Sequence, residues 1–486
     1  MDIKEIFERN ADSAGIIAEL KRGRGSELPD VALAIKAIDQ NKHDINDKSI
    51  RPDKMVKVDT PDSGFTKVTS GIGSEGTMRV ESVARIRLAI QKLIIRRAVS
   101  FLFGNDVVYN IDTADEVGEM IAKAFGKIIK DTKSNTQNRK VARAMFGYKE
   151  CAELWYPVEL PAESQRMGFK SKFKLRCAVF SPAFGDTLYP YFDETGDMIA
   201  FSRSYNRKVG GKNILYFETY TDKEHYLWIN GDNGYDLVEG YPREVAIGKI
   251  PVVFGHQDAF ETEDVDSLID RLEKLLSNFA DTNDYHASPK IFVTGQINGW
   301  SKKGESGAVI EGEEGAKMEY ISWQNAPESV RLEIETILKM IYTISQTPDI
   351  SFDSVKGIGA LSGVALKLLF MDAHLKVQDK REIFDEYLQR RANIIKAYIG
   401  QFNTQLEAAC DEIDITPEIT PYMLTSEIDE LNYWITANGN KPLISQEESI
   451  EKSGLSGNPK STYEKIKDEE NRSNSFSIGS PIENEY

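Results

Sequence analysis

Two stretches near the middle of the chain repeat their apolar residues at intervals of three and four. The first falls within residues 261–287 and the second within residues 327–347, and each leaves the rest of its surface polar. This spacing predicts two amphipathic helices that each bury one face. The apolar positions are Val265, Leu268, Ile269, Leu272, Leu275, Leu276 and Phe279 in the first stretch, and Val330, Ile334, Ile337, Leu338, Ile341 and Ile344 in the second.

The segments that follow these two helices differ in character. Residues 288–326 hold short β-like runs separated by glycines, which predicts a small insert of strands and turns. Pro348 ends the second helix, because its ring disfavours a helical conformation in the preceding residue. Residues 348–360 then predict an irregular glycine-bearing loop, and residues 361–402 predict a long helix because no proline interrupts them.

In the first 260 residues, the spacing of the apolar residues changes along the chain. Apolar residues recur at helical intervals over residues 80–103, which predicts an amphipathic helix there. From Tyr148 to His256 the period falls to two, and turns rich in Gly and Asn separate the runs. This pattern predicts antiparallel strands.

After residue 402 the chain returns to short helical patterns. Residues 403–472 predict several helices separated by turns, and the polar residues 473–486 predict a disordered tail. The fold class expected for the whole chain is α+β.

Composition narrows the classes of function. The 486 residues carry 60 Lys and Arg against 77 Asp and Glu, which gives a formal net charge of −17. This balance argues against a tight, sequence-reading DNA binder, whose affinity would come mainly from neutralised phosphates. A conduit for DNA remains compatible because an acidic wall keeps a polyanion from adhering, although the acidity also simply favours solubility. No apolar run approaches the roughly 20 residues that span a bilayer, so we expect no membrane partner.

No catalytic constellation is recognisable. The five histidines and three cysteines lie in no metal-ligand spacing, and the cysteines are odd in number and far apart. We therefore expect reduced thiols and no catalytic residue, metal or cofactor. The glycines from Gly357 to Gly363 lack the preceding strand and the Lys-Ser or Lys-Thr pair of a nucleotide-binding loop.

The dense carboxylates between Asp258 and Asp266 allow two interpretations. One is a metal-dependent nuclease or nucleotidyl transferase that uses this acidic cluster. The other, which we favour, is negative charge placed at a helix N-terminus, where it is stabilised by the helix dipole.

Three segments in the second half of the chain resemble, in the same order, the portal proteins of tailed bacteriophages, the head-to-tail connector family. The first is Gly248-Lys249-Ile250-Pro251-Val252-Val253-Phe254, followed by the acidic cluster and the first predicted helix. The second is Ile344-Ser345-Gln346-Thr347-Pro348-Asp349-Ile350-Ser351, followed by Gly359 and Ser362-Gly363-Val364-Ala365-Leu366-Lys367. The third runs from Leu443-Ile444-Ser445 to Glu469-Glu470.

The resemblance implies a portal fold with named parts. Residues 1–260 would form a wing of helices and antiparallel strands, and residues 288–326 a small α/β clip between two stem helices. The stem helices would be residues 261–287 and 327–347. The later parts would be a tunnel loop (348–360), a long kinked wing helix (361–402), a helical crown (403–472) and the disordered tail (473–486).

The resemblance also implies a structural role rather than an enzyme. It implies a dodecameric ring at one capsid vertex of the virion, through which double-stranded DNA passes without sequence specificity during packaging and ejection. The implied partners are the terminase large subunit, a head-completion or adaptor protein, the major capsid protein and a scaffold protein, with assembly in the host cytoplasm. A cellular scaffold or adaptor with helical arms is a further alternative.

The resemblance places two groups of residues near DNA. The tunnel loop would present Ser351, Phe352, Asp353, Ser354, Val355, Lys356, Gly357 and Gly359. The candidate lumen residues of the stem are Asp270, Arg271, Glu273, Lys274, Glu335 and Lys339. Lys356 is the mobile cation of the loop and is expected to touch phosphates without reading bases.

Overall fold

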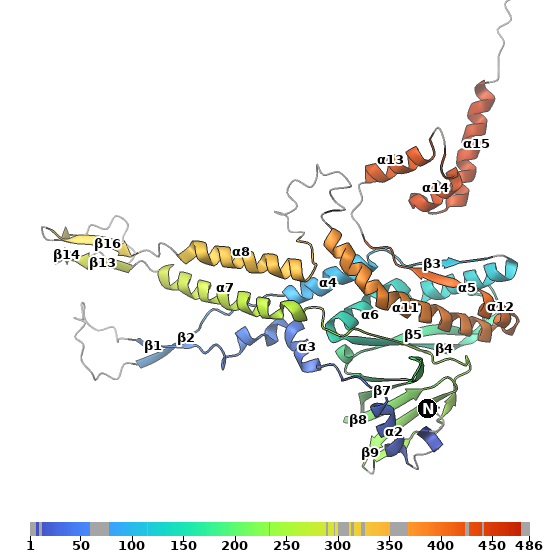
Figure 1. The fold of residues 1–486 in the computed structure, drawn as a ribbon, viewed down its shortest axis with the longest axis horizontal. Coiled ribbons are helices and arrows are strands. Elements are labelled where there is room, and N and C mark those ends of the chain that lie inside the picture. The colour runs from blue at the N-terminus through green and yellow to red at the C-terminus, as the bar shows by residue number, and fades with distance from the viewer. Residues whose placement is uncertain are drawn as a thin grey trace, which may run out of the picture. The chain divides into compact units, whose positions relative to one another are not determined.

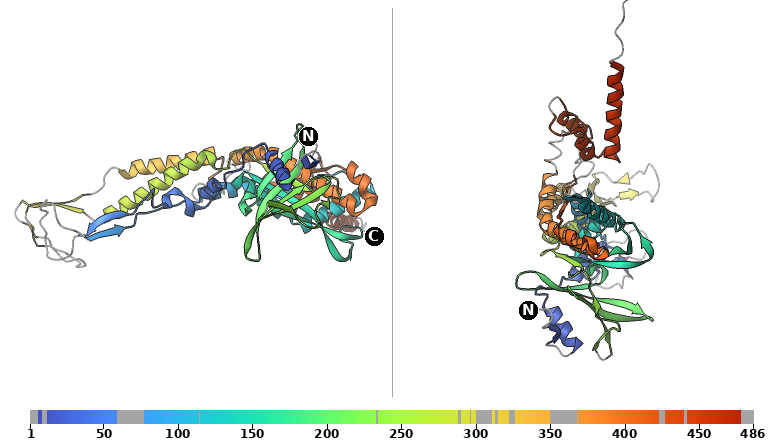
Figure 2. Two further views of the ribbon diagram at one scale, coloured as in Figure 1. Left: turned by 90° about the horizontal axis from the view of Figure 1, so that it is seen from below. Right: turned by 90° about the vertical axis from the view of Figure 1, so that its right-hand side faces the viewer.

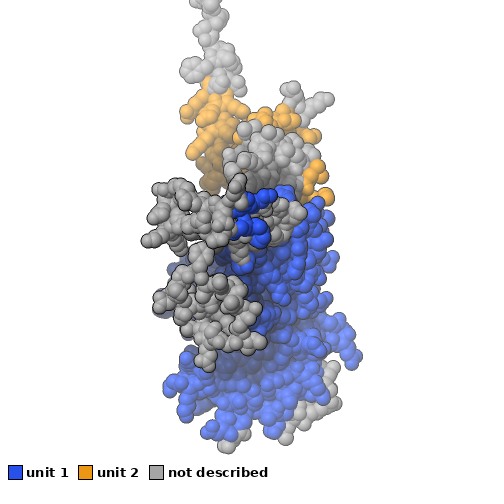
Figure 3. Space-filling view, turned by 90° about the vertical axis from the view of Figure 1, so that its left-hand side faces the viewer, with its two compact units in different colours: residues 1–348, 372–422 blue, residues 349–371, 423–486 orange. Residues whose placement is uncertain are grey.

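The chain divides into two compact units, each of which is described by itself (Figure 3). Met1–Pro348 with Asp372–Tyr422 form the first unit, and Asp349–Met371 with Met423–Tyr486 form the second. The computed structural model describes residues 6–8, 12–58, 77–113, 115–232, 234–287, 290–295, 297–299, 311–312, 315–321, 326–349, 368, 370–422, 427–439 and 442–477. Its helices and antiparallel sheets confirm the predicted α+β class (Figure 1).

Two antiparallel sheets form the β-rich part of the first unit. The larger has six strands in the order β10-β9-β8-β7-β6 with β11 also paired to β9, and the smaller has three in the order β12-β4-β5. The strands are β4 (Glu150–Ser164), β5 (Ser171–Phe180), β6 (Thr187–Phe192), β7 (Met198–Val209), β8 (Lys212–Tyr220), β9 (Glu224–Gly231), β10 (Gly234–Leu237), β11 (Arg243–Glu244) and β12 (Val252–His256). The predicted antiparallel strands between Tyr148 and His256 are confirmed.

Successive residues of β7 face two different cores. Phe201 packs with residues of the smaller sheet, including Leu154 and Phe180. Its neighbour Ala200 packs on the other side with Ile17 of α2 (Ser13–Arg22). Because side chains alternate along a strand, one run of sequence serves both cores. The larger sheet therefore lies between α2 and the smaller sheet.

The remaining helices of the first unit cover the smaller sheet or extend from it (Figures 1 and 2). They are α3 (Val31–Ile38), α4 (Ile90–Phe103), α5 (Glu116–Asp131), α6 (Ser134–Tyr148), α7 (Asp266–Ala287), α8 (Ala326–Ile344), α11 (Met371–Phe402, in this unit from Asp372) and α12 (Glu407–Glu412). Short 3-10 turns are η1 (Gln40–Lys42), η2 (Asp44–Asn46), η3 (Pro182–Phe184), η4 (Glu263–Val265) and η6 (Thr404–Leu406). Within the described residues, no helix has both the length and the hydropathy of a membrane span.

A buried ion pair ties α11 to the smaller sheet. Arg391 donates from Nε and Nη2 to the two carboxylate oxygens of Glu153, at 2.5 and 2.9 Å. Both side chains are fully buried. Arg391 also donates to Asn138 and Ser134 of α6, so one guanidinium joins three elements. Such forked pairing suits a buried arginine because it satisfies several donors at once.

The wing extends further along the chain than the sequence indicated. β17 (Ile415–Glu418) pairs antiparallel with β3 (Val108–Ile111), and α12 and β17 both belong to the first unit. The resemblance implies a crown over residues 403–472. The contacts place residues 403–422 with the wing instead, because β17 supplies the hydrogen-bonding partner of β3.

The helix predicted over residues 80–103 begins late, and this prediction is wrong for its first part. Residues 77–81 form strand β2 (Thr77–Glu81), paired with β1 (Lys54–Val58), and α4 starts only at Ile90. Between them, residues 82–89 run extended beside α7 (Figure 1).

Side chains of α7 hold this extended segment through its backbone. The amides of Ala84, Ile86 and Leu88 donate to Asp281 Oδ1, Ser277 Oγ and Glu273 Oε1 at 2.8, 2.9 and 2.6 Å. We call these three contacts the α7 ladder. Two extended residues advance about 6.6 Å and four helical residues about 6 Å, so the two spacings match. The α7 ladder satisfies donors that a helix over these residues would have satisfied internally.

The predicted clip consists of two small antiparallel pairs in its described residues. β13 (Lys290–Thr294) pairs with β16 (Lys317–Ile321), and β14 (Ile297–Gly299) pairs with β15 (Glu311–Gly312). Within residues 288–325, the described positions are in strands and turns, so the helical component expected of an α/β clip is not seen there.

The second unit is helical in its described residues. Its helices are α13 (Glu427–Ala437), α14 (Gln446–Ser453) and α15 (Pro459–Ser477). Ser445 and Glu448 form a capping box at the start of α14, which fixes where that helix begins. Helix α15 continues to Ser477, so residues 473–477 of the predicted disordered tail are helical, and residues 478–486 lie outside the described residues.

The α7 ladder predicts that Ser277→Ala destabilises the first unit. The substitution leaves the partly buried amide of Ile86 without its acceptor, which costs about 1 kcal/mol of unfolding free energy. Ser267→Ala is the matched control, because Ser267 is exposed on the same helix. Urea denaturation of both variants measures the difference. Equal stability of the two variants would contradict a stabilising role for the ladder.

Candidate functional site

Helices α7 and α8 lie side by side and share one apolar seam (Figures 1 and 2). Ile269 and Leu272 of α7 are buried against Ile341 of α8, each with at most 1% of its surface exposed. Ile94 of α4 closes the cluster at the end nearest the wing. The seam confirms the two predicted helices and most of their apolar positions. Across the outer surface, Arg271 forms a forked ion pair with Glu333 at 2.6 and 2.9 Å.

Three further apolar side chains of α8 remain exposed beside the seam with α7. Leu332, Met340 and Ile344 are 65%, 49% and 49% exposed. At 100° per residue, Leu332 lies on the side of α8 opposite Ile341, whereas Met340 lies about 100° and Ile344 about 60° around the helix from Ile341. We had assigned Ile344 to the buried face, and its exposure corrects that assignment. We call Leu332, Met340 and Ile344 the outer stripe.

The ends of α7, α8 and α11 meet at a joint built on buried charge. Lys376 of α11 contacts the Glu261 carboxylate and donates to the Ser345 carbonyl at 2.8 Å. Lys380 reaches the other Glu261 oxygen at 3.0 Å, and only 2% of the Glu261 side chain is exposed. Arg97 of α4 donates to the Pro348 carbonyl at 2.7 Å. These contacts fix both the start of α11 and the end of α8. No sequence pattern indicates these contacts, since the partners are more than thirty residues apart.

The acidic cluster does not assemble into a metal site. Glu261 is occupied by the two lysines, Glu263 accepts from the Phe260 amide at 3.0 Å, and Asp266 lies near Gln91. Asp258 is fully exposed. Within the described residues, no group of three or more His, Cys, Asp or Glu side chains is placed to hold a metal ion. The carboxylates therefore act on different partners, and the nuclease interpretation gains no support.

The candidate lumen residues divide into two groups. Asp270, Arg271, Lys274, Glu335 and Lys339 are exposed on α7 and α8. Glu273 is only 1% exposed and is a member of the α7 ladder, so its assignment to the lumen is wrong. A carboxylate on the polar side of an amphipathic helix looks solvent-facing until its partner elsewhere in the chain is known. The tunnel-loop residues Ser351, Phe352, Asp353, Ser354, Val355, Lys356, Gly357 and Gly359 lie outside the described residues.

The partner of Glu273 is His43, just after η1. His43 Nδ1 lies 2.7 Å from Glu273 Oε1, and Nε2 lies 3.1 Å from the Ala37 carbonyl. Both neighbours are acceptors, so only a doubly protonated ring donates to both. Burial opposes that charge, but the hydrogen bond and negative charge of Glu273 outweigh it and raise the pKa of His43.

The raised pKa makes the His43–Glu273 pair pH-dependent. A group whose pKa is higher in the folded state stabilises most below its unfolded pKa, near 6.5, and loses this contribution as pH rises through the folded value. We expect His43→Gln to destabilise by about 3–5 kcal/mol at low pH, because the buried Glu273 carboxylate loses its cationic partner and keeps only the Leu88 amide. The difference in unfolding free energy between His43→Gln and the unsubstituted chain should become smaller as pH rises.

Thermal unfolding of both proteins across mildly acidic to mildly alkaline pH measures this difference. His256→Gln is the control, because the His256 side chain is 56% exposed. A difference in stability between His43→Gln and the unsubstituted chain that stays constant with pH would show that folding leaves the pKa of His43 unshifted.

One protein family matches most of the chain. A family model described as phage portal protein, SPP1 Gp6-like, matches residues 40–475. No curated protein gives a significant match. Similar solved structures include the neck of an empty GTA particle computed with C6 symmetry, with 11% identity, a TM-score of 0.38, and coverage of 75% of this chain and 89% of that chain.

Two further solved structures are similar at the same level. The neck of a native GTA particle computed with C12 symmetry has 10% identity and a TM-score of 0.37, with 75% of this chain and 88% of that chain covered. The virion of a native gene transfer agent particle has 11% identity and a TM-score of 0.35, with the same coverage. The family model spans most of the sequence. The chain therefore belongs to the phage portal protein family, SPP1 Gp6-like.

Proposed function

We propose that copies of this chain form a ring at one capsid vertex, through which double-stranded DNA passes during packaging and ejection. The observation that supports the ring is the outer stripe of α8. Leu332, Met340 and Ile344 expose apolar surface that no other part of the described chain covers, on a strip that runs from the back of α8 to the edge of its seam with α7. Contiguous exposed apolar residues of this kind indicate a protein contact. In the proposed ring, a dodecamer as in the resemblance, the outer stripe packs against the next copy.

The exposed charges of the stem suit passage rather than retention of DNA. Arg271 is paired with Glu333, and Glu335 accepts from Arg331 at 3.4 Å. Lys274 and Lys339 carry positive charge, and Asp270 carries negative charge. Tight DNA binding requires many unpaired cations on the phosphates. A surface of mixed and partly paired charge gives weak, sequence-independent contact, and neither a metal nor a cofactor is needed for it.

The tunnel loop is proposed to touch the DNA. It connects Pro348, which is held by Arg97, to α11, which is held at Lys376. Both supports lie in the first unit. The loop sequence offers Lys356 for phosphates and the glycines Gly357 and Gly359 for changes of shape.

The partners expected for this role follow from the family. We propose that the clip docks the terminase large subunit and, after packaging, a head-completion or adaptor protein. Short paired strands such as β14 and β15 leave edges that another chain can extend. The wing is proposed to meet the major capsid protein and a scaffold protein, with assembly in the host cytoplasm and the mature ring in the virion.

The outer stripe predicts that Leu332→Glu blocks ring formation. Burying a carboxylate in an apolar contact costs several kcal/mol per interface, and the ring repeats that interface at every copy. Native mass spectrometry should show single chains or short open arcs. Leu237→Glu is the control, since Leu237 is exposed on β10, and it should assemble normally. If Leu332→Glu forms full rings, the outer stripe does not lie in the interface between copies.

The tunnel loop predicts a defect in DNA handling without a defect in assembly. Replacing Ser351–Lys356 with glycine and serine, or introducing Lys356→Glu, should reduce the DNA retained per particle several-fold, because the loop then lacks or repels phosphate contact. Lys208→Glu, at an exposed end of β7, is the matched charge reversal. Quantification of nuclease-protected DNA in assembled particles measures the effect. Normal DNA content in both loop variants would refute the proposed contact.

A further inference from the structure

A groove between α4 and α6 is unrelated to the stem helices. Its volume is about 500 Å³, and its walls come from four elements of the first unit. Lys92, Ile95 and Arg96 line it from α4, and Ile38 lies at the end of α3. The other lining residues are Lys140, Arg143, Ala144 and Tyr148 of α6, and Ala183 and Phe184 of η3. We call it the α4–α6 groove.

Every charged side chain that lines the groove is positive. Lys92, Arg96, Lys140 and Arg143 supply the charge, and no carboxylate lines the groove. Among the described residues, none of these four side chains makes a hydrogen bond or an ion pair. This differs from other cations of the same unit, such as Arg51, Arg85 and Arg203, which are each paired with a carboxylate. The charge of Asp39 at the end of α3 acts on Lys92 from outside the groove lining. In a chain with a net charge of −17, four neighbouring cations with no carboxylate bound directly to them form a local field that attracts anionic groups.

The floor of the groove is apolar. Ile95 and Ala144 are each 5% exposed and close its base. Phe184 stands at the rim and is 62% exposed. Phosphate contacts to nucleic acid need N–H donors and cations but no apolar floor. An apolar side chain of a bound protein segment needs such a floor, because burying it supplies the affinity.

We propose that the α4–α6 groove binds a short acidic segment of a partner protein, with one large apolar side chain placed between carboxylates. The apolar side chain lies on Ile95 and Ala144 beside Phe184, and the flanking carboxylates pair with Arg96 and Arg143. The volume is in the range of pockets that enclose a small ligand or a few residues. The residues that line the groove are far fewer than the roughly twenty to thirty residues on each side of a stable protein interface. This difference favours a peptide segment over the face of a second copy.

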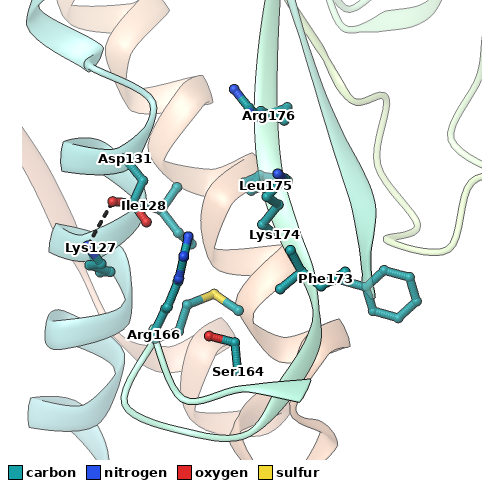
Figure 4. Close-up of a pocket in the computed structure, with 11 residues that line it drawn as sticks. Lys127, Ile128, Asp131, Ser164, Arg166, Phe173, Lys174, Leu175 and Arg176 are labelled. Atoms are coloured by element: carbon teal, nitrogen blue, oxygen red, sulfur yellow. Dashed lines mark hydrogen bonds and ion pairs between the residues drawn. The ribbon is translucent and has the colours of Figure 1, made fainter. Parts of the chain in front are cut away.

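This inference goes beyond the proposed channel, because the groove is complete within one chain. The wing holds a second basic hollow, between α5 and the β4–β5 hairpin (Figure 4). Its volume is only about 200 Å³, and Asp131 lines it and pairs with Lys127 at 2.8 Å. Arg166, Lys174 and Arg176 provide the remaining cations there. The smaller hollow therefore serves as a comparison for the α4–α6 groove. It carries similar positive charge, but its floor has less apolar surface and one carboxylate already lines it.

The test measures binding of a fluorescent peptide to the purified full-length chain by anisotropy. The peptide alternates Glu and Gly around one central Phe, and a second peptide has Ser in place of that Phe. We expect saturable binding of the Phe peptide, weakened about tenfold or more in the double variant Arg96→Glu with Arg143→Glu, because attraction becomes repulsion. The Ser peptide should also bind about tenfold more weakly, because it lacks the apolar anchor.

The control variant is Arg166→Glu with Arg176→Glu in the smaller hollow, which changes the net charge by the same amount. It should bind the Phe peptide like the unsubstituted chain. Phe184→Ser alters only an exposed ring and should weaken binding without a change of charge, so it tests the groove even if the double variant folds poorly. The proposal is overturned if the Phe peptide does not bind, if the control variant loses binding equally, or if duplex DNA displaces the Phe peptide from the groove.

Discussion

The α7 ladder is the contact on which the position of the stem depends. Three backbone amides of residues 84–88 have no partner within their own segment, and α7 supplies an acceptor for each. Buried amides left without an acceptor are costly, so α7 is held in one rotation about its axis. That rotation turns Ile269 and Leu272 toward α8. It also determines which side chains of α7 remain exposed.

The joint at Glu261 acts at the other end of the same helices. Two lysines of α11 and one carboxylate hold three helix ends together, in surroundings from which most water is excluded. Buried charges are stable only when they are paired, so the joint favours one arrangement of α7, α8 and α11. The ladder and the joint thus fix the stem from two sides, and the outer stripe is left on the surface as a consequence.

Most of the helices and strands could be predicted from the spacing of apolar residues alone. Helices α7, α8, α14 and the strands from β4 to β10 follow clear spacings of three to four or of two. Over residues 80–89 the prediction is wrong, because Val83, Ile86 and Ile90 mimic a helical stripe while the amides of Ile86 and Leu88 are bound by side chains of α7. Within the β-rich region from Tyr148 to His256, β12 shows the pattern least clearly, since Val252 and Val253 are adjacent and both buried. Glu273 was misplaced because its partner His43 lies 230 residues away.

The matching of the α7 ladder has a consequence for how such a stem can change in length. Adding one residue to either side would put amides opposite the wrong side chains and break all later contacts. Adding two residues to the extended segment and four to the helix restores the match, with one more rung of about 6 Å. Relatives with longer or shorter stems should therefore differ in these coupled steps, while the identity of each acceptor is free to vary among Ser, Thr, Asp, Asn and Glu.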